Sequence, residues 1–188
     1  MKYISIPSST DIYFVTSRVT RYRSVFLSEE LSMIPLQSLS WIREKKTWQI
    51  FAFCLMPNHL HLLIKILNKT PIEKVMGQFH SFSGHKIIDT LKKNHATALL
   101  NSFMVEGMRK GDRKYLFWED SLARCVETEH VLVETLEYIH NNPVNKKWHL
   151  VDDRSDYQFS SACYYDNEKI PIIPIDDYWE SFGETPSS

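Results

Sequence analysis

The chain has 188 residues, of which 43% are hydrophobic and 13% aromatic, which excludes a disordered protein and fits one well-filled domain. Three cysteines without a C-x-x-C spacing indicate free thiols, and the N-terminal apolar run is too short for a secretory signal, so we expect a cytoplasmic protein. The five glycines form neither G-x-G-x-x-G nor a Walker loop, so we expect no nucleotide cofactor.

The net charge of −1 is unevenly distributed along the chain. Residues 1–150 carry 20 basic and 14 acidic side chains, a net charge of +6, whereas residues 151–188 carry 2 and 9, a net charge of −7. We therefore expect a domain over 1–150 with a polyanion-binding surface, and an acidic C-terminal extension over 151–188 that packs on it or trails it. The candidate phosphate contacts are Arg18, Arg21, Arg23, Arg109, Lys110, Arg113 and Lys114. Ordinary solvated faces are the alternative for each cluster alone.

The hydrophobic pattern predicts alternating strands and helices. In chain order these are a strand at 11–17, a helix from 28 to about 46 that is broken or kinked near Pro35, strands at 48–56 and 58–66, a helix from 70 to about 93, a basic loop at 94–114, a strand within 115–126 and a helix from 128 to about 141. The order β-α-β-β-α-β-α favours an α+β fold of the ferredoxin-like type. In this fold a split β-α-β unit forms an antiparallel sheet, and we expect the helices to pack on one face of it.

The segment 47–64 contains no Asp, Glu, Lys or Arg, yet Pro57 would break a membrane-spanning helix at its middle. Two strands joined at 56–58 fit better. In the second strand His59 and His61 point to the same face, whereas Leu60 and Leu62 take the opposite face and can reach a core. Two imidazoles projecting together suit a divalent metal. Structural histidines bonded to backbone carbonyls remain the alternative.

The last predicted helix ends at Asn142, because a residue before proline is pushed away from helical torsions. Tyr138 and Asn142 lie one turn apart on one flank of the buried stripe, so their side chains are neighbours. A packed tyrosine and a helix-capping asparagine are the structural alternative.

Two longer motifs make the pattern specific. Met-Pro-Asn-His-Leu-His-Leu-Leu-Ile at 56–64 and Tyr-Ile-His-Asn-Asn-Pro-Val at 138–144 resemble the HUH single-tyrosine transposases. The chain is most similar to the REP-associated, insertion-sequence-like members of this group. Further matches are Phe-Trp-Glu-Asp at 117–120 and Asp-Tyr-Gln-Phe-Ser-Ser-Ala-Cys-Tyr-Tyr at 156–165, so the likeness covers about 11–165.

The resemblance implies a role for each motif residue. His59 and His61 would hold Mg²⁺ or Mn²⁺, Asn142 would complete the metal site, and Tyr138 would be the nucleophile that forms a 5′-phosphotyrosine. The implied partner is single-stranded or hairpin DNA from palindromic repeats, bound by a monomer or homodimer in the prokaryotic cytoplasm, next to the nucleoid. The sequence departs from the family at 145–148, Asn-Lys-Lys-Trp, where a basic residue followed by small ones is common.

Three points remain open at this level. No general base is evident, and Glu134, on the same flank as Tyr138, is only a candidate. A non-catalytic DNA-binding repressor derived from a transposase is one alternative function. A metal-dependent phosphohydrolase in which the tyrosine has no role is another. We expect no membrane association.

Overall fold

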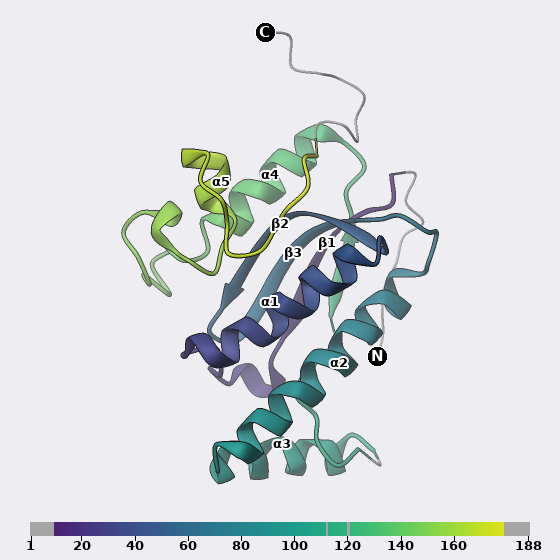
Figure 1. The fold of residues 1–188 in the computed structure, drawn as a ribbon, viewed down its shortest axis with the longest axis vertical. Coiled ribbons are helices and arrows are strands. Elements are labelled where there is room, and N and C mark those ends of the chain that lie inside the picture. The colour runs from purple at the N-terminus through teal and green to yellow at the C-terminus, as the bar shows by residue number, and fades with distance from the viewer. Residues whose placement is uncertain (1–9, 112, 120, 179–188) are drawn as a thin grey trace, which may run out of the picture.

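The computed structural model of the protein describes residues 10–111, 113–119 and 121–178 (Figure 1). Its centre is a four-stranded sheet made of β1 (Ile12–Arg18), β2 (Trp48–Met56), β3 (His59–Ile66) and β4 (Leu122–Cys125). The strands lie in the order β2-β3-β1-β4, and all neighbours are antiparallel. The split β-α-β unit produces this order, because the crossover from β1 to β2 leaves a gap that β3 fills. The α+β, ferredoxin-like fold class is thus confirmed.

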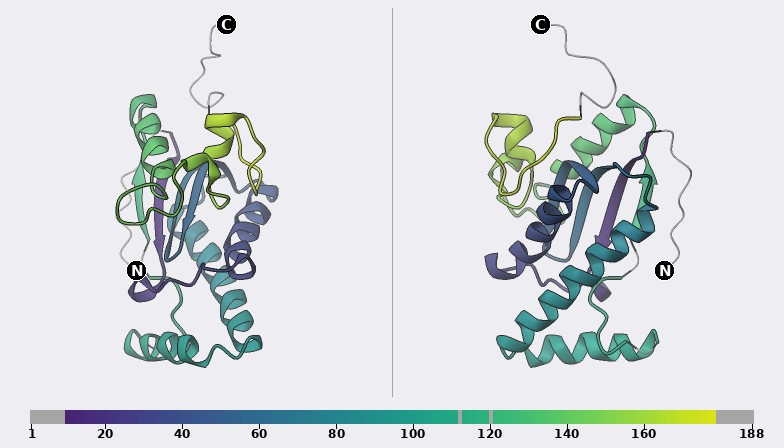
Figure 2. Two further views of the ribbon diagram at one scale, coloured as in Figure 1. Left: turned by 90° about the vertical axis from the view of Figure 1, so that its left-hand side faces the viewer. Right: turned by 45° about the vertical axis from the view of Figure 1, so that its right-hand side comes forward.

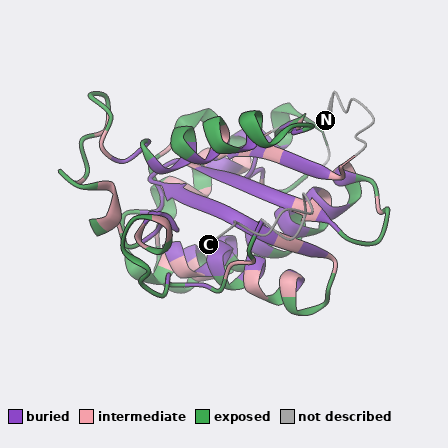
Figure 3. Ribbon diagram, turned by 90° about the horizontal axis from the view of Figure 1, so that it is seen from above, coloured by how far each residue is buried: buried purple, intermediate pink, exposed green. Residues whose placement is uncertain are grey.

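One face of the sheet is covered by α1 (Glu29–Glu44) and α2 (Ile72–Lys93), and the side chains between them form the larger hydrophobic core. The Ser28 hydroxyl caps α1 by accepting a hydrogen bond from the backbone N–H of Leu31. The helix then continues through Pro35, so of the two alternatives predicted there, a break or a kink, the break is wrong. Figure 3 shows the strands largely buried and the outer sides of the helices exposed.

The opposite face is also covered, which differs from the expectation that the helices share one face. Here α4 (Glu129–His140) packs on β2 and β3 through Leu132, Leu136 and Ile139, forming a second core. The left view of Figure 2 shows the sheet between α4 and α1. The reason is the same alternation that places Leu60 and Leu62 in the first core. Phe51, Cys54 and Leu63 point the other way and need apolar cover as well.

One element prediction between α2 and α4 was wrong, and another is confirmed over part of its range. Residues 94–114 were expected to be a loop, but α3 (Thr97–Arg109) occupies most of this stretch and buries Phe103. The strand expected within 115–126 is limited to β4, and the residues before it run along α3 instead. There the backbone N–H of Leu116 donates to the carbonyl of Phe103. None of the described helices is both long and apolar enough to span a lipid bilayer.

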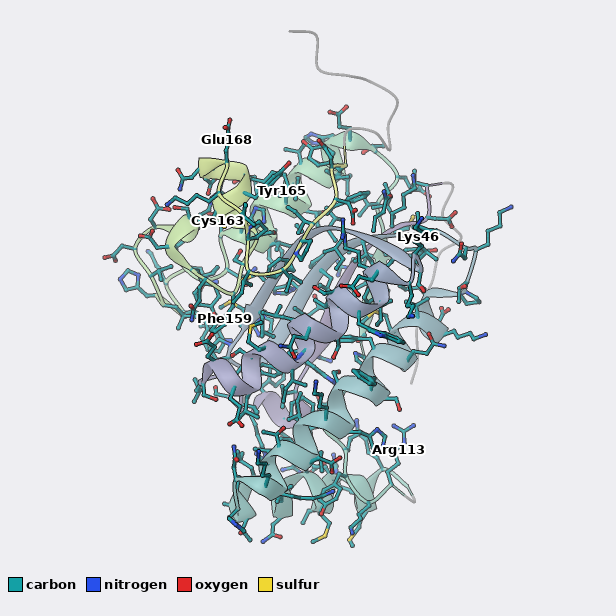
Figure 4. The ribbon with its side chains drawn as sticks, in the orientation of Figure 1. Lys46, Arg113, Phe159, Cys163, Tyr165 and Glu168 are labelled. Carbon is teal, nitrogen blue, oxygen red and sulfur yellow. The ribbon has the colours of Figure 1, made fainter. Side chains whose placement is uncertain are left out.

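The described part of the acidic extension packs on the rest of the chain. It contains the 3₁₀ turn η2 (Arg154–Asp156) and the short helix α5 (Ala162–Asn167). The hydroxyls of Tyr157 and Tyr165 donate to the carbonyls of Leu55 and Phe51 on β2, at 2.8 and 2.7 Å. Figure 4 labels Tyr165 beside α4. The extension therefore covers β2 and supports the α4 side of the sheet.

Candidate functional site

The two histidines lie at the start of β3, immediately after the turn that joins it to β2. They point to the α4 side of the sheet, and their ring centroids are 4.6 Å apart. His61 is only 3% exposed and His59 is half-buried. The histidine face of β3 is therefore not a free polar surface but the rim of the second core.

His61 is oriented by its neighbours on β1. Its Nδ1 lies 2.9 Å from the Thr16 hydroxyl, and its ring stacks on Phe14 with 5.6 Å between centroids. Thr16 is the register partner of His61, so strand pairing alone brings the hydroxyl to the ring. The other nitrogen, Nε2, is buried and has no hydrogen-bond partner among the described residues. A buried polar atom without a partner is costly unless a ligand satisfies it.

His59 is oriented in the same way by a different group. Its Nδ1 lies 2.6 Å from the side-chain oxygen of Asn58, and Asn58 is itself held by a 2.9 Å bond from its amide nitrogen to the carbonyl of Tyr22. The indole of Trp148 lies 5.9 Å from the His59 ring, between centroids. In both histidines Nδ1 is therefore engaged, and Nε2 is the atom left for a ligand.

Both imidazoles are neutral at neutral pH. Burial, with smaller contributions from the cations of Lys147 and Arg18, lowers the pKa of His59 to about 4. Burial and the neighbouring His59 lower the pKa of His61 to about 3, whereas the hydrogen-bonding side chain of Asn142 acts to raise it. A neutral ring with Nδ1–H donated to an oxygen has its lone pair on Nε2, which is the form that binds a metal ion.

Tyr138 projects from the last turn of α4 toward the same point. The Thr128 hydroxyl caps this helix at its N-terminus by accepting from the N–H of Val131. The Tyr138 ring lies 5.3 Å from that of His61 and meets Phe14 edge-on at 5.7 Å, both between centroids. Its side chain is nevertheless 55% exposed. An exposed tyrosine beside a buried imidazole is accessible to a macromolecular substrate.

Asn142 is buried just beyond the end of α4. Its amide nitrogen donates to the carbonyl of Tyr138 at 2.7 Å, so the amide oxygen is the atom that could bind a cation. In the described part of the chain no three His, Cys, Asp or Glu side chains gather to form a metal site. A cation here would depend on two imidazoles, one amide oxygen, and water or substrate oxygens, a donor set that leaves open positions on an octahedral ion.

His59, His61, Tyr138 and Asn142 form the centre of the site. Of the other candidate residues, some lie beside these four and some do not. Arg18 is the register partner of His59 and lies at the site, donating to the Tyr22 hydroxyl at 2.5 Å. Glu134 is exposed one turn before Tyr138, where its carboxylate lies 3.4 Å from Nε2 of His130. The structure provides no additional support for Glu134 as a base.

The remaining basic residues surround α3 rather than the histidines. Arg21 and Arg109 both pair with the buried carboxylate of Glu106, at 2.5 and 2.9 Å, and Arg23 donates to the Ser102 hydroxyl at 2.8 Å. Arg21 and Arg23 therefore hold α3 against the turn after β1, whereas the Arg109 pair lies within α3 itself. Lys110, Arg113 and Lys114 follow at the end of α3 and in the segment beyond it, where Figure 4 labels Arg113.

Sequence reasoning missed the residues that hold the site in place. Thr16 and Phe14 are in the first strand, and only the β1–β3 register reveals that they touch His61. Arg154 pairs with Glu137, next to Tyr138, at 2.6 Å, and also with Asp166 at 2.7 Å. Asn58 was inside the recognised motif, and its place directly before His59 is the one signal that could have indicated its role.

Comparison with known proteins identifies a family, and the solved structures of similar fold include two transposases. The family model described as "Transposase IS200 like" matches residues 8–142. The structure of a REP-associated tyrosine transposase bound to a REP hairpin is similar with a TM-score of 0.63 and 15% identity, over 94% of this chain and 92% of that one. A provisional transposase from Deinococcus radiodurans R1 gives a TM-score of 0.43 and 19% identity, over 69% and 88%. No curated protein matches the sequence.

Proposed function

Because the chain belongs to the IS200-like transposase family, we propose that it cleaves and rejoins single-stranded DNA at hairpins formed by palindromic repeats, through a covalent link to Tyr138. The observation that carries the proposal is the exposed Tyr138 beside His61, whose buried Nε2 has no partner. The similar REP-associated transposase was solved with a REP hairpin, which supports hairpin DNA as the substrate class.

Nε2 of His59, Nε2 of His61 and the amide oxygen of Asn142 would hold Mg²⁺ or Mn²⁺. When bound, such an ion polarises the scissile phosphate and stabilises the charge that develops on its oxygens. Thr16 and Asn58 fix the two rings, so the lone pairs are directed before any ligand arrives. Arg18, next to His59, would attract the phosphate backbone to the same place.

Tyr138 supplies the nucleophile. Its Oη forms a bond to phosphorus while the bond from phosphorus to the 3′ oxygen of the preceding nucleotide breaks. The tyrosine hydroxyl gives up its proton, and the departing 3′ oxygen takes one up as a 3′-OH. The product is a 5′-phosphotyrosine. Because the ester is exchanged and not hydrolysed, a 3′-OH from another strand can reverse the reaction and rejoin DNA without ATP.

A denaturing gel tests the proposal directly. Wild-type protein incubated with Mn²⁺ and a hairpin library should give a DNA–protein adduct that survives denaturant, and Tyr138→Phe should give none. Tyr22→Phe is the matched control, because Tyr22 is 54% exposed and contacts Arg18 at the same end of the sheet. It should retain the adduct. An adduct that persists in Tyr138→Phe and disappears in Tyr22→Phe would overturn the choice of nucleophile.

The two alternative functions give different results in the same assay. A repressor would bind the hairpin without an adduct at any metal concentration. A phosphohydrolase would release phosphate from a small ester, and Tyr138→Phe would leave that rate unchanged.

A further inference from the structure

His140 is a buried residue of the motif at 138–144 to which the proposed chemistry assigns no role. It is the last residue of α4, two positions after Tyr138, and it is 1% exposed. Its Nε2 lies 2.8 Å from the hydroxyl of Ser161, which directly precedes α5 in the C-terminal extension. Its ring also packs on Tyr165 of α5, with 5.1 Å between centroids. The helix that carries Tyr138 is therefore bonded at its end to the extension.

Ser161 connects that bond to the sheet. The residue is completely buried, and its backbone N–H donates to the carbonyl of Phe53 on β2 at 3.0 Å. Its hydroxyl in turn accepts the N–H of Phe53, also at 3.0 Å. Tyr165 makes a parallel connection, because its hydroxyl donates to the carbonyl of Phe51. In Figure 4 the labels Phe159 and Tyr165 mark this part of the extension. Directional bonds between buried atoms thus join β2, Ser161 and His140.

The position of His140 on α4 gives this bond influence over Tyr138. Successive helical residues are separated by about 100°, so residues two apart point to opposite sides of the helix. Tyr138 faces His61, and His140 faces Ser161. The remainder of the helix packs on the sheet through apolar side chains, and such contacts are non-directional. The bond from His140 is directional, so it can fix the rotation of the helix about its own axis.

A small rotation of α4 is enough to affect the reaction. An α-helix with its side chains has a radius of about 5–6 Å, so a rotation of about 10° moves its outermost atoms by roughly 1 Å. A misplacement of about 1 Å between reacting groups can slow a reaction about 100-fold. The Tyr138 side chain is 55% exposed, so it has little packing of its own that would correct such a shift.

We propose that His140 is a positioning residue for the reaction of Tyr138. Its bond to Ser161 holds α4 at the rotation that brings the tyrosine hydroxyl to the scissile phosphate at the two histidines of β3. The inference rests on the proposed function for the identity of the reaction. It makes the C-terminal extension part of the cleavage machinery, because the extension supplies Ser161. A protein in which this bond is broken should still bind hairpin DNA but cleave it slowly.

Two substitutions at His140 test the bond without opening a cavity. His140→Phe keeps a flat ring and loses the nitrogen, whereas the Ser161 hydroxyl keeps its contacts with Phe53. His140→Gln carries an amide that can take the place of Nε2. With saturating protein and Mn²⁺, His140→Phe should form the Tyr138 adduct about 10- to 100-fold more slowly than wild type in a single-turnover gel assay. Its hairpin affinity, measured by fluorescence anisotropy, should stay near wild type, and His140→Gln should recover most of the rate.

Ser161→Ala removes the same bond from the other side. Its rate should fall by a similar factor, and adding it to His140→Phe should slow the reaction no further, because both changes break one interaction. Ser83→Ala is the matched control for lost stability. The Ser83 hydroxyl is also completely buried, accepts from the indole N–H of Trp118 at 3.0 Å and donates to a carbonyl within α2, on the other face of the sheet from α4. This control should lower the melting temperature by a comparable amount and leave the rate unchanged.

The placement of Tyr138 can also be measured without DNA. The rings of Tyr138 and His61 lie 5.3 Å apart between centroids, so nuclear Overhauser contacts between their ring protons report how the helix is rotated. These contacts should weaken in His140→Phe and return in His140→Gln. A role confined to overall stability would leave them unchanged in the folded variants.

The inference is overturned if folded His140→Phe forms the adduct at the wild-type rate, or if Ser83→Ala slows the reaction as much as Ser161→Ala does. If His140→Phe fails to fold, Ser161→Ala decides by the same criteria. The two measurements also separate this inference from the proposed function. An adduct whose rate does not respond to His140 refutes the positioning role alone. Overhauser contacts that respond to His140, in a protein whose wild type forms no adduct, refute the proposed chemistry alone.

Discussion

Thr16→Val is the substitution that best tests whether the histidines bind a metal. Valine has nearly the shape of threonine but lacks the hydroxyl 2.9 Å from Nδ1 of His61. The ring then loses the partner that fixes its orientation and tautomer. Loss of such a partner weakens metal binding by roughly 10- to 100-fold, and a buried polar atom left unsatisfied costs about 1–3 kcal/mol of folding free energy.

The expected size of the effect follows from linkage. With Mn²⁺ at about 100 times the wild-type Kd, binding adds roughly 2.7 kcal/mol to the free energy of unfolding. A variant that binds about 10- to 100-fold more weakly gains only roughly 1.4 to 0.4 kcal/mol at the same concentration. Chemical denaturation of wild type and Thr16→Val, each with and without Mn²⁺, measures these gains directly.

Two matched variants separate metal binding from folding. Thr16→Ser keeps the hydroxyl and should keep most of the Mn²⁺ effect. Ser17→Ala removes the neighbouring hydroxyl, which bonds to His80 on the other face, so it should lower stability without changing the Mn²⁺ effect. If Thr16→Val is destabilised but gains as much from Mn²⁺ as wild type does, His61 is not a metal ligand and the proposed site is wrong.

Two further predictions concern stability and the placement of α4. Burial lowers the pKa of His80 to about 3 and that of His140 to about 4, so the unfolded chain binds more protons below about pH 6.5. Their stabilising contribution is fully present above that pH and is lost as the pH falls toward the folded-state values. The loss is about 2 kcal/mol for each group near pH 5, and a melting temperature that stays constant between pH 7 and 5 would contradict this. Arg154→Gln should break the ion pairs with Glu137 and Asp166, slowing adduct formation in a single-turnover gel assay while hairpin affinity stays near wild type. Rescue by Arg154→Lys is expected to be partial, because lysine cannot form the paired contacts of a guanidinium.

Local pattern was enough to predict the elements that carry the candidate site. Alternation within 59–64 places His59 and His61 on one side of a strand, and helical spacing places Tyr138 and Asn142 on one side of a helix. In the structure the histidines share one side of β3, and Asn142, just beyond the end of α4, lies one turn after Tyr138 and bonds to its carbonyl. Their meeting point could not be derived from periodicity, because it depends on α4 packing against β2 and β3 rather than joining α1 and α2. Only the resemblance to a family predicted that the two motifs would meet.

The error over 94–114 has a local and a long-range source. Leu99, Leu100 and Phe103 recur at helical spacing and pack on the core, but charged and polar residues around them favoured a loop. In the structure Glu106, buried at 2% exposure between Arg21 and Arg109, holds α3 to the turn after β1. Composition alone would place the Glu106 carboxylate in solvent, whereas in the structure it is buried and anchors α3. No window of sequence reveals this, since Arg21 and Glu106 are 85 positions apart in the numbering.

The acidic extension also uses carboxylates to hold the fold together. Its surplus of negative charge would repel DNA, but two of its carboxylates are engaged in ion pairs within the protein. Asp176 binds Arg43 through two bonds of 2.8 and 2.7 Å and also accepts the N–H of Ile50 on β2, and Asp166 binds Arg154. Neutralising Asp176 would therefore damage the fold before it altered any long-range field. A test of tail charge on DNA binding needs carboxylates without such partners, and Asp152, exposed and paired among the described residues with the nearby His149 alone, is a better choice.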